Sequence, residues 1–302
     1  MIRYFAALLL VLSATLSSGQ DLQPRRWGHF PMDTNFAGVL YGYTSADLYL
    51  NPSLRVENAT LDKHTAAFSY VRSFELLGKS ARFDLVQAYQ DGRWEGVVDG
   101  VDTSTSRTGF SDTALRFSMN LYGAPPLSGE EYLKYRAEKR DCETIVGAAL
   151  IVVLPTGHYL KDRLLNLGEN RFTIRPQIGM VHSRGPWSFE LTGSVWFYTD
   201  NDSFFNGSTL EQDPLWSFQS HVVYTFRPGF WLATGAAFGT DGQSTLDGNR
   251  LNDYKNNFLW GTSLGMSISP KLGFQLTYIS SKTLERSGAD SDSFLLGATY
   301  MW

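Results

Sequence analysis

The amino-acid sequence predicts an all-β protein, a transmembrane antiparallel up-and-down β-barrel of about 12 strands. Three observations predict this fold. The chain ends on an amphipathic strand, and the connections between its amphipathic runs alternate between short and long. In addition, no apolar run after residue 20 reaches the ~18 residues that a membrane helix needs. The longest, Ile145 to Leu154, has ten residues, which excludes a helical membrane protein.

The last strand, residues 292–302, has one strongly apolar face. That face carries Phe294, Leu296, Ala298, Tyr300 and Trp302, opposite Gly297, Thr299 and Met301. Such an edge would be open to unwanted pairing in a soluble protein, whereas a closed barrel pairs every strand and turns its apolar face to lipid. The ending resembles the C-terminal signature of bacterial outer-membrane barrels. Tyr300 and Trp302 are therefore candidates for the signal that the barrel assembly machinery reads.

Residues 1–19 are expected to be a signal peptide. Arg3 gives the positive start, Phe5 to Leu12 the short apolar core, and Ser17-Ser18-Gly19 the small residues for cleavage before Gln20. An uncleaved anchor helix is the alternative. The rest of the chain, 20–302, is expected to form one barrel domain. Its single cysteine, Cys142, allows no disulfide within the chain and lies far from the cleavage point, so a lipoprotein is not expected.

Composition adds few constraints on the partners. The chain has 28 glycines, 14% aromatic residues and a net charge of −4. Because it has no basic patch, we expect no nucleic-acid partner. The partners expected of a barrel are outer-membrane lipid, lipopolysaccharide, the assembly machinery and a small-molecule solute, and the location expected is the bacterial outer membrane.

Twelve amphipathic runs follow one another from Asn35, each near the length of a tilted membrane strand. They are 35–43, 64–77, 81–91, 110–122, 142–156, 171–183, 187–199, 215–227, 231–240, 257–269, 274–282 and 292–302. Several alternate clearly. In the run 171–183, Phe172, Ile174, Ile178 and Met180 oppose Thr173, Arg175, Gln177 and Gly179.

The connections between these runs alternate in length. Long loops are expected at 44–63, 92–109, 157–170, 200–214 and 241–256, and tight turns at 78–80, 184–186, 228–230 and 270–273. Outer-membrane barrels have short periplasmic turns and long external loops, whereas a soluble sandwich lacks this rhythm. The count would be ten or fourteen if one hairpin is assigned wrongly, and the assignment depends most on residues 35–63.

One periplasmic link, 123–141, is longer than the others. Ser128 followed by Glu131 has the spacing of a capping box, and Tyr132, Leu133 and Tyr135 then follow at helical spacing. We expect a short helix near 129–140. It either rests on the membrane interface or barrel bottom, or acts as a plug or docking site.

The predicted inward faces carry charges of both signs. The lumen candidates are Arg82, Asp84, Arg116, Arg175, Glu190 and His221, with Glu75 also facing inward. Arg175 and Glu190 flank a tight turn and are expected to pair; Asp84 and Arg116 lie on neighbouring strands whose register is left open. Paired charges cost less than single ones in a narrow lumen. The set is either an ion-paired wall or a constriction, and its mixed sign argues against strong ion selectivity.

The outer loops and the histidines carry little sign of chemistry. The loop 200–214 holds Asp200, Asp202, Glu211 and Asp213 around Phe204 and Phe205, in a spacing that fits no calcium motif. The paired phenylalanines either cover the barrel mouth or contact lipopolysaccharide. His64 and His221 are the histidines weighed for a hydrolase, but no Gly-x-Ser-x-Gly elbow is present. We expect no enzyme, no metal and no cofactor.

The stretch from about residue 109 to 302 resembles the outer-membrane family described as "Putative MetA-pathway of phenol degradation". The resemblance rests on Gly109-Phe110-Ser111-Asp112, Leu121-Tyr122-Gly123-Ala124-Pro125, Leu154-Pro155-Thr156-Gly157-His158-Tyr159, Leu167-Gly168-Glu169-Asn170-Arg171, Trp196-Phe197-Tyr198-Thr199-Asp200-Asn201 and Gln212-Asp213-Pro214-Leu215. Glu169 is inserted before the family's usual asparagine, which leaves Asn170 and Arg171 in place.

This resemblance implies a channel for passive uptake of small, often hydrophobic or aromatic, solutes. The family has no catalytic motif to transfer. Pro155, Asn170 and Arg171 are expected at the outer rim, as loop architecture first and permeation gate second. The rival interpretation is a closed structural or adhesive barrel that acts through its outer loops.

Overall fold

The computed structural model describes residues 22–49, 56–251 and 253–302. The expected signal peptide, 1–19, lies outside the described residues. In the part of the chain that the structure describes, no helix is long and apolar enough to cross a membrane.

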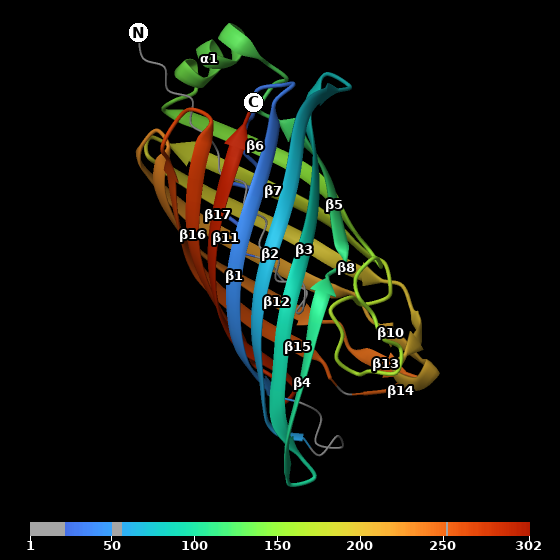
Figure 1. Cartoon of the computed structure of the whole chain (residues 1–302). Helices are drawn as coiled ribbons and strands as arrows, with labels where there is room; N and C mark the ends of the chain where they lie inside the picture. Colours follow the sequence, from blue (N-terminus) through green and yellow to red (C-terminus); the bar gives the residue numbers. More distant parts are fainter. Residues whose placement is uncertain (1–21, 50–55, 252) are drawn as a thin grey trace.

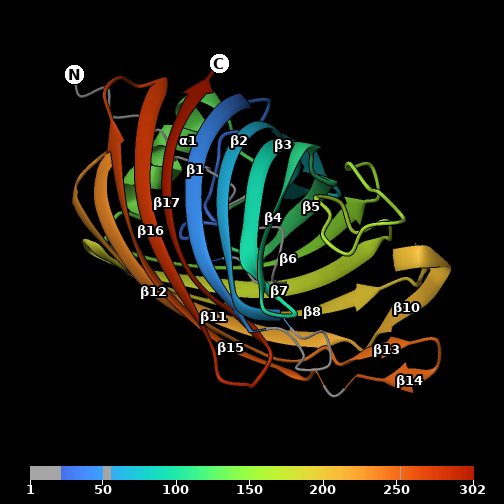
Figure 2. The same ribbon diagram turned by 60° about the horizontal axis from the view of Figure 1, so that its bottom comes forward.

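The main sheet closes on itself as a barrel (Figures 1 and 2). Its strands are β1 (Asn35–Tyr49), β2 (Val56–Leu76), β3 (Lys79–Val98), β4 (Val101–Phe110), β5 (Thr113–Tyr122), β6 (Cys142–Leu154), β7 (Thr173–Arg184), β8 (Trp187–Tyr198), β11 (Leu215–Arg227), β12 (Phe230–Asp241), β15 (Lys255–Ser267), β16 (Leu272–Thr283) and β17 (Gly288–Met301). β4 and β5 both pair with β3 and share one position in the wall. The barrel therefore has twelve strand positions, as predicted. Antiparallel pairing of β1 with β17 closes the ring.

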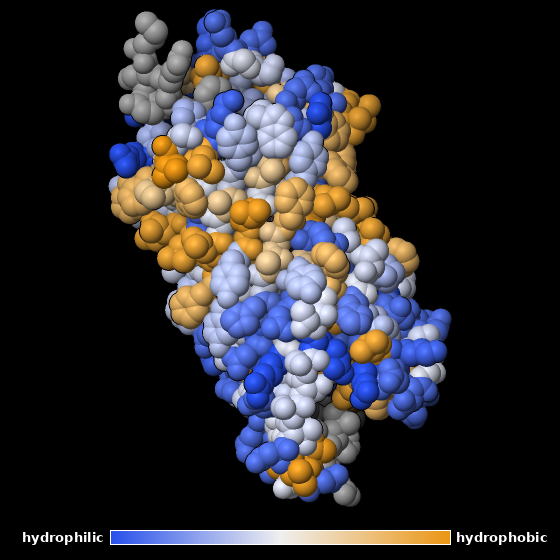
Figure 3. Space-filling model, viewed as in Figure 1, coloured by the Kyte–Doolittle hydropathy of each residue, from blue (hydrophilic) through white to orange (hydrophobic). Residues whose placement is uncertain are grey.

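The wall alternates between lipid-facing and lumen-facing side chains. In β7, Ile174, Ile178 and Met180 are exposed, whereas Thr173, Arg175 and Gln177 are buried, as the sequence predicts. Phe294, Leu296, Tyr300 and Trp302 are likewise exposed on the outside. Apolar residues form a band across the barrel, and the end opposite the C-terminus is mostly hydrophilic (Figure 3).

The two ends of the barrel differ. The C-terminus, helix α1 (Gly129–Glu138) and the tight turns lie at one end, which is the periplasmic end of an outer-membrane barrel (Figure 1). Trp302 exchanges backbone hydrogen bonds with Asn35 there, at 3.0 and 3.1 Å. The helix is confirmed, but Ser128 makes no side-chain hydrogen bond at its N-terminus, so the predicted capping box is not formed.

The outer parts of the first strands are longer than predicted. The segment 92–109, expected to be a loop, is mostly a hairpin of β3 and β4 turned at Asp99 and Gly100, both with positive φ. Much of 44–63 is also strand. In these extensions the apolar alternation that reveals a membrane strand is lost: the exposed face is polar, as at Asp62 and His64, and Lys63 is among the buried residues.

The loops 200–214 and 241–256 also contain regular structure. They form a small second sheet of β9 (Asn201–Phe204), β10 (Ser208–Gln212), β13 (Ser244–Leu246) and β14 (Asn249–Arg250), with a short turn of 3₁₀ helix, η2, at Phe205–Gly207. This sheet projects to the side of the barrel at its outer end (Figures 1 and 2).

Candidate functional site: the plugged lumen

Residues 22–34, which we call the plug, run inside the barrel before β1 begins. Trp27 is its largest buried side chain and stacks against β6 and β7. A Cβ added at Gly147 would lie 2.5 Å from the Trp27 ring, and one at Gly179 only 2.0 Å from Trp27 Nε1. The two glycines therefore form a seat for the indole, whose N–H donates to Thr192 Oγ1 at 2.7 Å.

The deepest described residue of the plug completes an apolar belt. Leu22 packs with buried residues on one side of the barrel wall, namely Leu40, Ala67, Ala88, Ala237, Leu259, Ile279 and Leu295. These side chains come from seven neighbouring strands, β12 to β3 through the β17–β1 closure, so this side of the lumen is apolar beside Leu22. The belt is thus an apolar stretch of the lumen wall, and Leu22 of the plug packs against it.

A second polar contact joins the plug to β8. The backbone N–H of Arg25 donates to Glu190 Oε2 at 2.7 Å, and the Arg25 guanidinium lies over the Trp231 ring at 5.3 Å. A buried carboxylate needs such a donor to offset its desolvation. Glu190 therefore serves as an anchor for the plug.

The periplasmic part of the plug contacts helix α1. His29 Nε2 lies 2.7 Å from the Pro125 carbonyl oxygen, and the Tyr132 hydroxyl donates to the His29 carbonyl at 3.0 Å. The rings of Tyr132 and Tyr135 meet the imidazole edge-on at 4.9 and 5.1 Å. Burial lowers the pKa of His29 to about 4, with the positive charge of Arg136 acting in the same direction. His29 is therefore neutral at pH 7.

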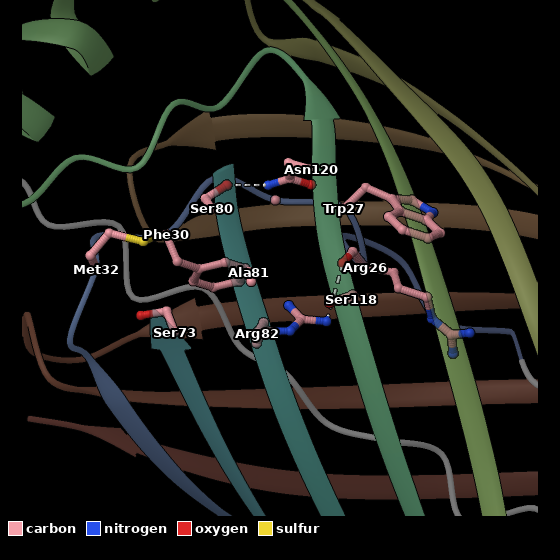
Figure 4. A pocket seen from close by; sticks show the side chains of 11 residues that line it. Arg26, Trp27, Phe30, Met32, Ser73, Ser80, Ala81, Arg82, Ser118 and Asn120 are labelled. Atoms are coloured by element: carbon pink, nitrogen blue, oxygen red, sulfur yellow. Dashed lines mark hydrogen bonds between the residues drawn. The ribbon is translucent and has the colours of Figure 1, made fainter. Parts of the chain in front are cut away.

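Little space remains beside the plug. A cavity of about 20 Å³, room for about one water molecule, lies between the plug and the wall (Figure 4). Arg26, Phe30 and Met32 of the plug face Ser73, Arg82 and Asn120 of the wall across it. The plug and this part of the wall therefore lie close together.

The predicted lumen charges are buried, and one predicted pair is present. Asp84 lies opposite Arg116 in the β3–β5 register, with Arg116 Nη1 3.1 Å from Asp84 Oδ2. Arg82 Nε lies 2.8 Å from Asp84 Oδ1. The carboxylate thus bridges two guanidinium groups. His221 also faces the lumen, opposite Glu190 in the β8–β11 register.

The predicted pairing of Arg175 with Glu190 is wrong. The tight turn sets Arg184 opposite Trp187, so Glu190 lies opposite Val181, six residues along β7 from Arg175. Arg175 instead donates from Nε to Ser194 Oγ at 3.0 Å and stacks over Trp196 at 4.0 Å. Glu75, also expected inside, is exposed at the periplasmic rim.

The outer-rim residues form loop architecture around a buried carboxylate. Asp112, between β4 and β5, accepts backbone hydrogen bonds from Gly157 and Glu169, both at 2.8 Å. Asn170 donates to Asn201 Oδ1 at 2.8 Å. Pro155 begins the connection that leads to Gly157.

Arg171 ties the same connection to the small sheet. Its guanidinium bonds to Glu169 at 3.0 Å and to Gln212 at 2.5 Å, and it lies over the Tyr198 ring at 4.4 Å. These contacts support the loop role that the sequence suggested for Arg171.

Other candidates lie away from the lumen. Phe204 ends β9 and Phe205 starts η2, in the small sheet beside the barrel rather than across its mouth. His64 is on the outer wall, where its Nδ1 lies 2.7 Å from the Tyr41 hydroxyl. Among the described residues, no three His, Cys, Asp or Glu side chains are grouped to hold a metal ion.

The family of the chain follows from a match to a family model. The model of the family "Putative MetA-pathway of phenol degradation" matches residues 46–289. The chain belongs to this family. The match extends the resemblance that the sequence motifs indicated from residue 109 toward the N-terminus. No curated protein matches the chain.

Solved structures place the family member among outer-membrane barrels. The COG4313 outer membrane channel from Pseudomonas putida F1 has 20% sequence identity and a TM-score of 0.76, over 93% of this chain and 100% of that one. The transport unit of the autotransporter AIDA-I from Escherichia coli has 11% identity and a TM-score of 0.51, over 93% of this chain and 92% of that one. At these identities the likeness establishes the fold, that of an outer-membrane barrel.

The plug of this family member was not predicted from its sequence. Residues 22–34 have neither strand nor helix periodicity, and their seat is made of glycines that a pattern of apolar residues does not reveal. The available signal was the cluster of Arg25, Arg26, Trp27 and Phe30 between the expected cleavage site and the first strand. Large aromatic residues are mostly buried in folded proteins, so their presence in this segment argues against an exposed tail.

Proposed function

We propose that this protein is an outer-membrane channel for passive uptake of small, hydrophobic or aromatic, solutes. The observation that carries the proposal is a closed barrel with residues 22–34, the segment before β1, held inside the lumen by non-covalent contacts. Family membership supports the proposal, and so does the fold that the chain shares with a protein described as an outer membrane channel.

In this proposal the plug is the gate. A solute enters from the hydrophilic outer end, meets the apolar belt around Leu22, and passes when the plug yields. Apolar side chains at the belt favour solutes that lose water readily. Diffusion down a gradient is the driving force, because the barrel carries no energy source of its own.

The proposal includes the route to the membrane. The signal peptide 1–19 is removed on export, the assembly machinery reads the exposed Tyr300 and Trp302, and the apolar band then sits in lipid and lipopolysaccharide. We infer no catalytic role, so His64→Ala is expected to leave transport unchanged.

Flux into liposomes tests the proposal. Liposomes that contain the refolded protein should swell in isotonic solutions of small aromatic solutes faster than protein-free liposomes do. Sugars of similar size should enter more slowly because they do not shed water at the apolar belt. Vesicles that stay sealed to every solute would contradict the channel.

A closed barrel that acts through its outer loops is the second candidate. The close fit of the plug, with a cavity of about 20 Å³, favours it. It predicts sealed vesicles, and it predicts that deleting 241–256, with its part of the small sheet, abolishes a cell-surface interaction while the barrel still assembles.

A further inference from the structure

Strand β4 has one edge that the barrel leaves open. It pairs with β3 along one side, and among the described residues no strand pairs with its other side. The β3–β4 hairpin reaches farther from the C-terminal end than the small sheet does (Figure 1). Natural sheets protect such edges with proline, lysine or a bulge, and β4 has none of these. An unprotected edge at the outer tip of the barrel can pair with a strand of another molecule.

The backbone groups on the open edge belong to the even-numbered residues. Just after β4, the Ser111 N–H donates to the Ala88 carbonyl of β3 at 2.9 Å, whereas the Phe110 carbonyl accepts from the His158 N–H on the other side at 2.7 Å. Successive residues of a strand direct their N–H and C=O groups to alternate edges. Three exposed residues of β4 therefore face the open edge, namely Asp102, Ser104 and Ser106.

Two neighbouring side chains limit the length of the open edge. His158 Nδ1 lies 3.3 Å from the Thr108 carbonyl oxygen, so the edge is covered from residue 108 onward. Arg107 Nη1 donates to the Ser106 carbonyl at 2.7 Å, a contact at the surface that a flexible side chain can release. The open part of the edge thus extends from Asp102 to Ser106 and has Ser104 at its centre.

This open edge is complementary to itself. If two copies pair antiparallel with Ser104 opposite Ser104, then Thr103 lies opposite Thr105 and Asp102 lies opposite Ser106. No like charges face each other in this register. Hydroxyl side chains opposite one another are also among the pairs that stabilise antiparallel strands, so a second copy of this chain is a suitable partner.

Symmetry determines where that second copy lies. Antiparallel strands from two copies are related by a two-fold axis perpendicular to the strands, and this rotation reverses the direction of the barrel axis. Two barrels in one membrane point the same way, so their β4 strands cannot pair in this manner. Barrels in the facing outer membranes of two cells point toward each other, and their hairpins are the parts that meet first.

We propose that β4 joins this protein to a second copy on a neighbouring cell, in a sheet with the strand order β3–β4–β4–β3. One such contact is short and weak, but many copies on two facing surfaces act together. This function goes beyond solute uptake and does not rest on the proposed channel. Its failure would therefore leave the channel proposal unchanged.

Settling of cells tests the proposal. Bacteria without long O-antigen chains that display the wild type should clump, and labelled cells without the protein should stay outside the clumps. Ser104→Pro removes the central N–H donor of the open edge and no hydrogen bond to β3, so it should reduce clumping several-fold. Ser104→Thr keeps that donor and should clump like the wild type.

Three results would overturn the proposal. Cells that carry the folded wild-type barrel at their surface would stay dispersed, or their clumps would take up cells without the protein equally well. Equal clumping of wild-type and Ser104→Pro cells would also overturn it, because the open edge would then play no part.

A disulfide tests the register. In a Cys142→Ser background, which removes the single native cysteine, Ser104→Cys places two Cα atoms about 5.5 Å apart across the contact, a separation that a disulfide spans. Ser106→Cys is the matched control, because its two copies lie four residues apart along the strands, about 13 Å. Oxidised clumps should contain a covalent dimer of Ser104→Cys alone. Equal dimer yields at both positions, or no dimer of Ser104→Cys in clumped cells, would contradict the antiparallel pairing.

Discussion

Trp27 shows how single residues close this barrel. An indole fits flat against a strand only where the wall has no side chains, and Gly147 and Gly179 provide that space on adjacent strands. Thr192 Oγ1 accepts the indole N–H at 2.7 Å and so fixes the ring. Both the packing of the ring and this hydrogen bond therefore depend on glycine at positions 147 and 179.

Gly179→Ala should therefore release the plug. Its Cβ would lie 2.0 Å from Trp27 Nε1, a distance that the rigid ring and the strand backbone cannot accommodate without a shift. We expect trypsin to cleave after Arg25 or Arg26 in folded Gly179→Ala and to spare the wild type, as read by mass spectrometry. Gly193→Ala is the control, because its Cβ would meet only Phe218 at 3.7 Å. Equal protection of all three proteins would contradict the seat.

Asp112→Ala should loosen the outer rim. The change leaves the N–H groups of Gly157 and Glu169 without their acceptor, at a cost of about 1–3 kcal/mol for each buried group. Trypsin should then cut faster at Lys161 and Arg163, in the connection that Asp112 holds, while the barrel stays folded. Asp202→Ala, on the exposed small sheet, should leave the cleavage rate unchanged. If both variants are cut alike, Asp112 does not organise this rim.

Sequence reasoning at this scale succeeded where strand pairing is local. Asp84 and Arg116 were placed on neighbouring strands and do pair. Arg175 and Glu190 were predicted to pair because both lie near the tight turn. The turn, however, fixes which residues of β7 and β8 lie opposite each other, and these two do not. Asp112 was recognised only as part of a family motif, since its partners come from backbone groups of a distant loop.

At the scale of elements, the plug and helix α1 form one unit through His29. The docked imidazole faces the Pro125 carbonyl, Tyr132, Tyr135 and the charge of Arg136. Burial favours its neutral form, and its pKa falls from 6.5 to about 4. An undocked His29 takes up a proton below about pH 6.5, while the docked one resists, so the docked state loses stability as pH falls from 6.5 toward 4.

The channel should accordingly open more at acidic pH. The pKa difference corresponds to at most about 3 kcal/mol of docking free energy, lost progressively over that range. Recording the fraction of time spent open at pH 7 and pH 4.5 should show a several-fold rise. His29→Gln, which keeps a donor for Pro125 but does not titrate, should flatten the change. Identical pH profiles for the two proteins would assign the effect to another group.

The strands themselves were largely predictable, and the reason is physical. Inside the apolar band each strand has one face in lipid and one in the lumen, so β7, β8 and β11 begin and end within two residues of the predicted runs. Beyond the band that contrast disappears, and β1 to β4 extended past the predicted ends. The helix was found from spacing alone, although its expected cap is absent.

For the molecule as a whole, the twelve-stranded barrel has a lumen too wide for its wall residues to fill by themselves. The plug occupies it on the periplasmic side, the apolar belt beside Leu22 lines one side of it, and buried arginines line it over β3, β5 and β7. In the proposed channel, closure by a movable segment would separate this protein from a barrel packed shut by its own wall. Fold class and family were readable from the sequence, whereas the plug was not, because it depends on contacts between segments far apart in the chain.

Single-channel recording of the wild type beside Trp27→Ala tests the central claim most directly. Removing the indole leaves the seat empty and frees the plug, so Trp27→Ala should show a long-lived open current where the wild type shows brief openings from a closed baseline. A wild type that is steadily open with the same conductance as Trp27→Ala would contradict the plug as a gate. The same contradiction would follow if Trp27→Ala folded and stayed as closed as the wild type.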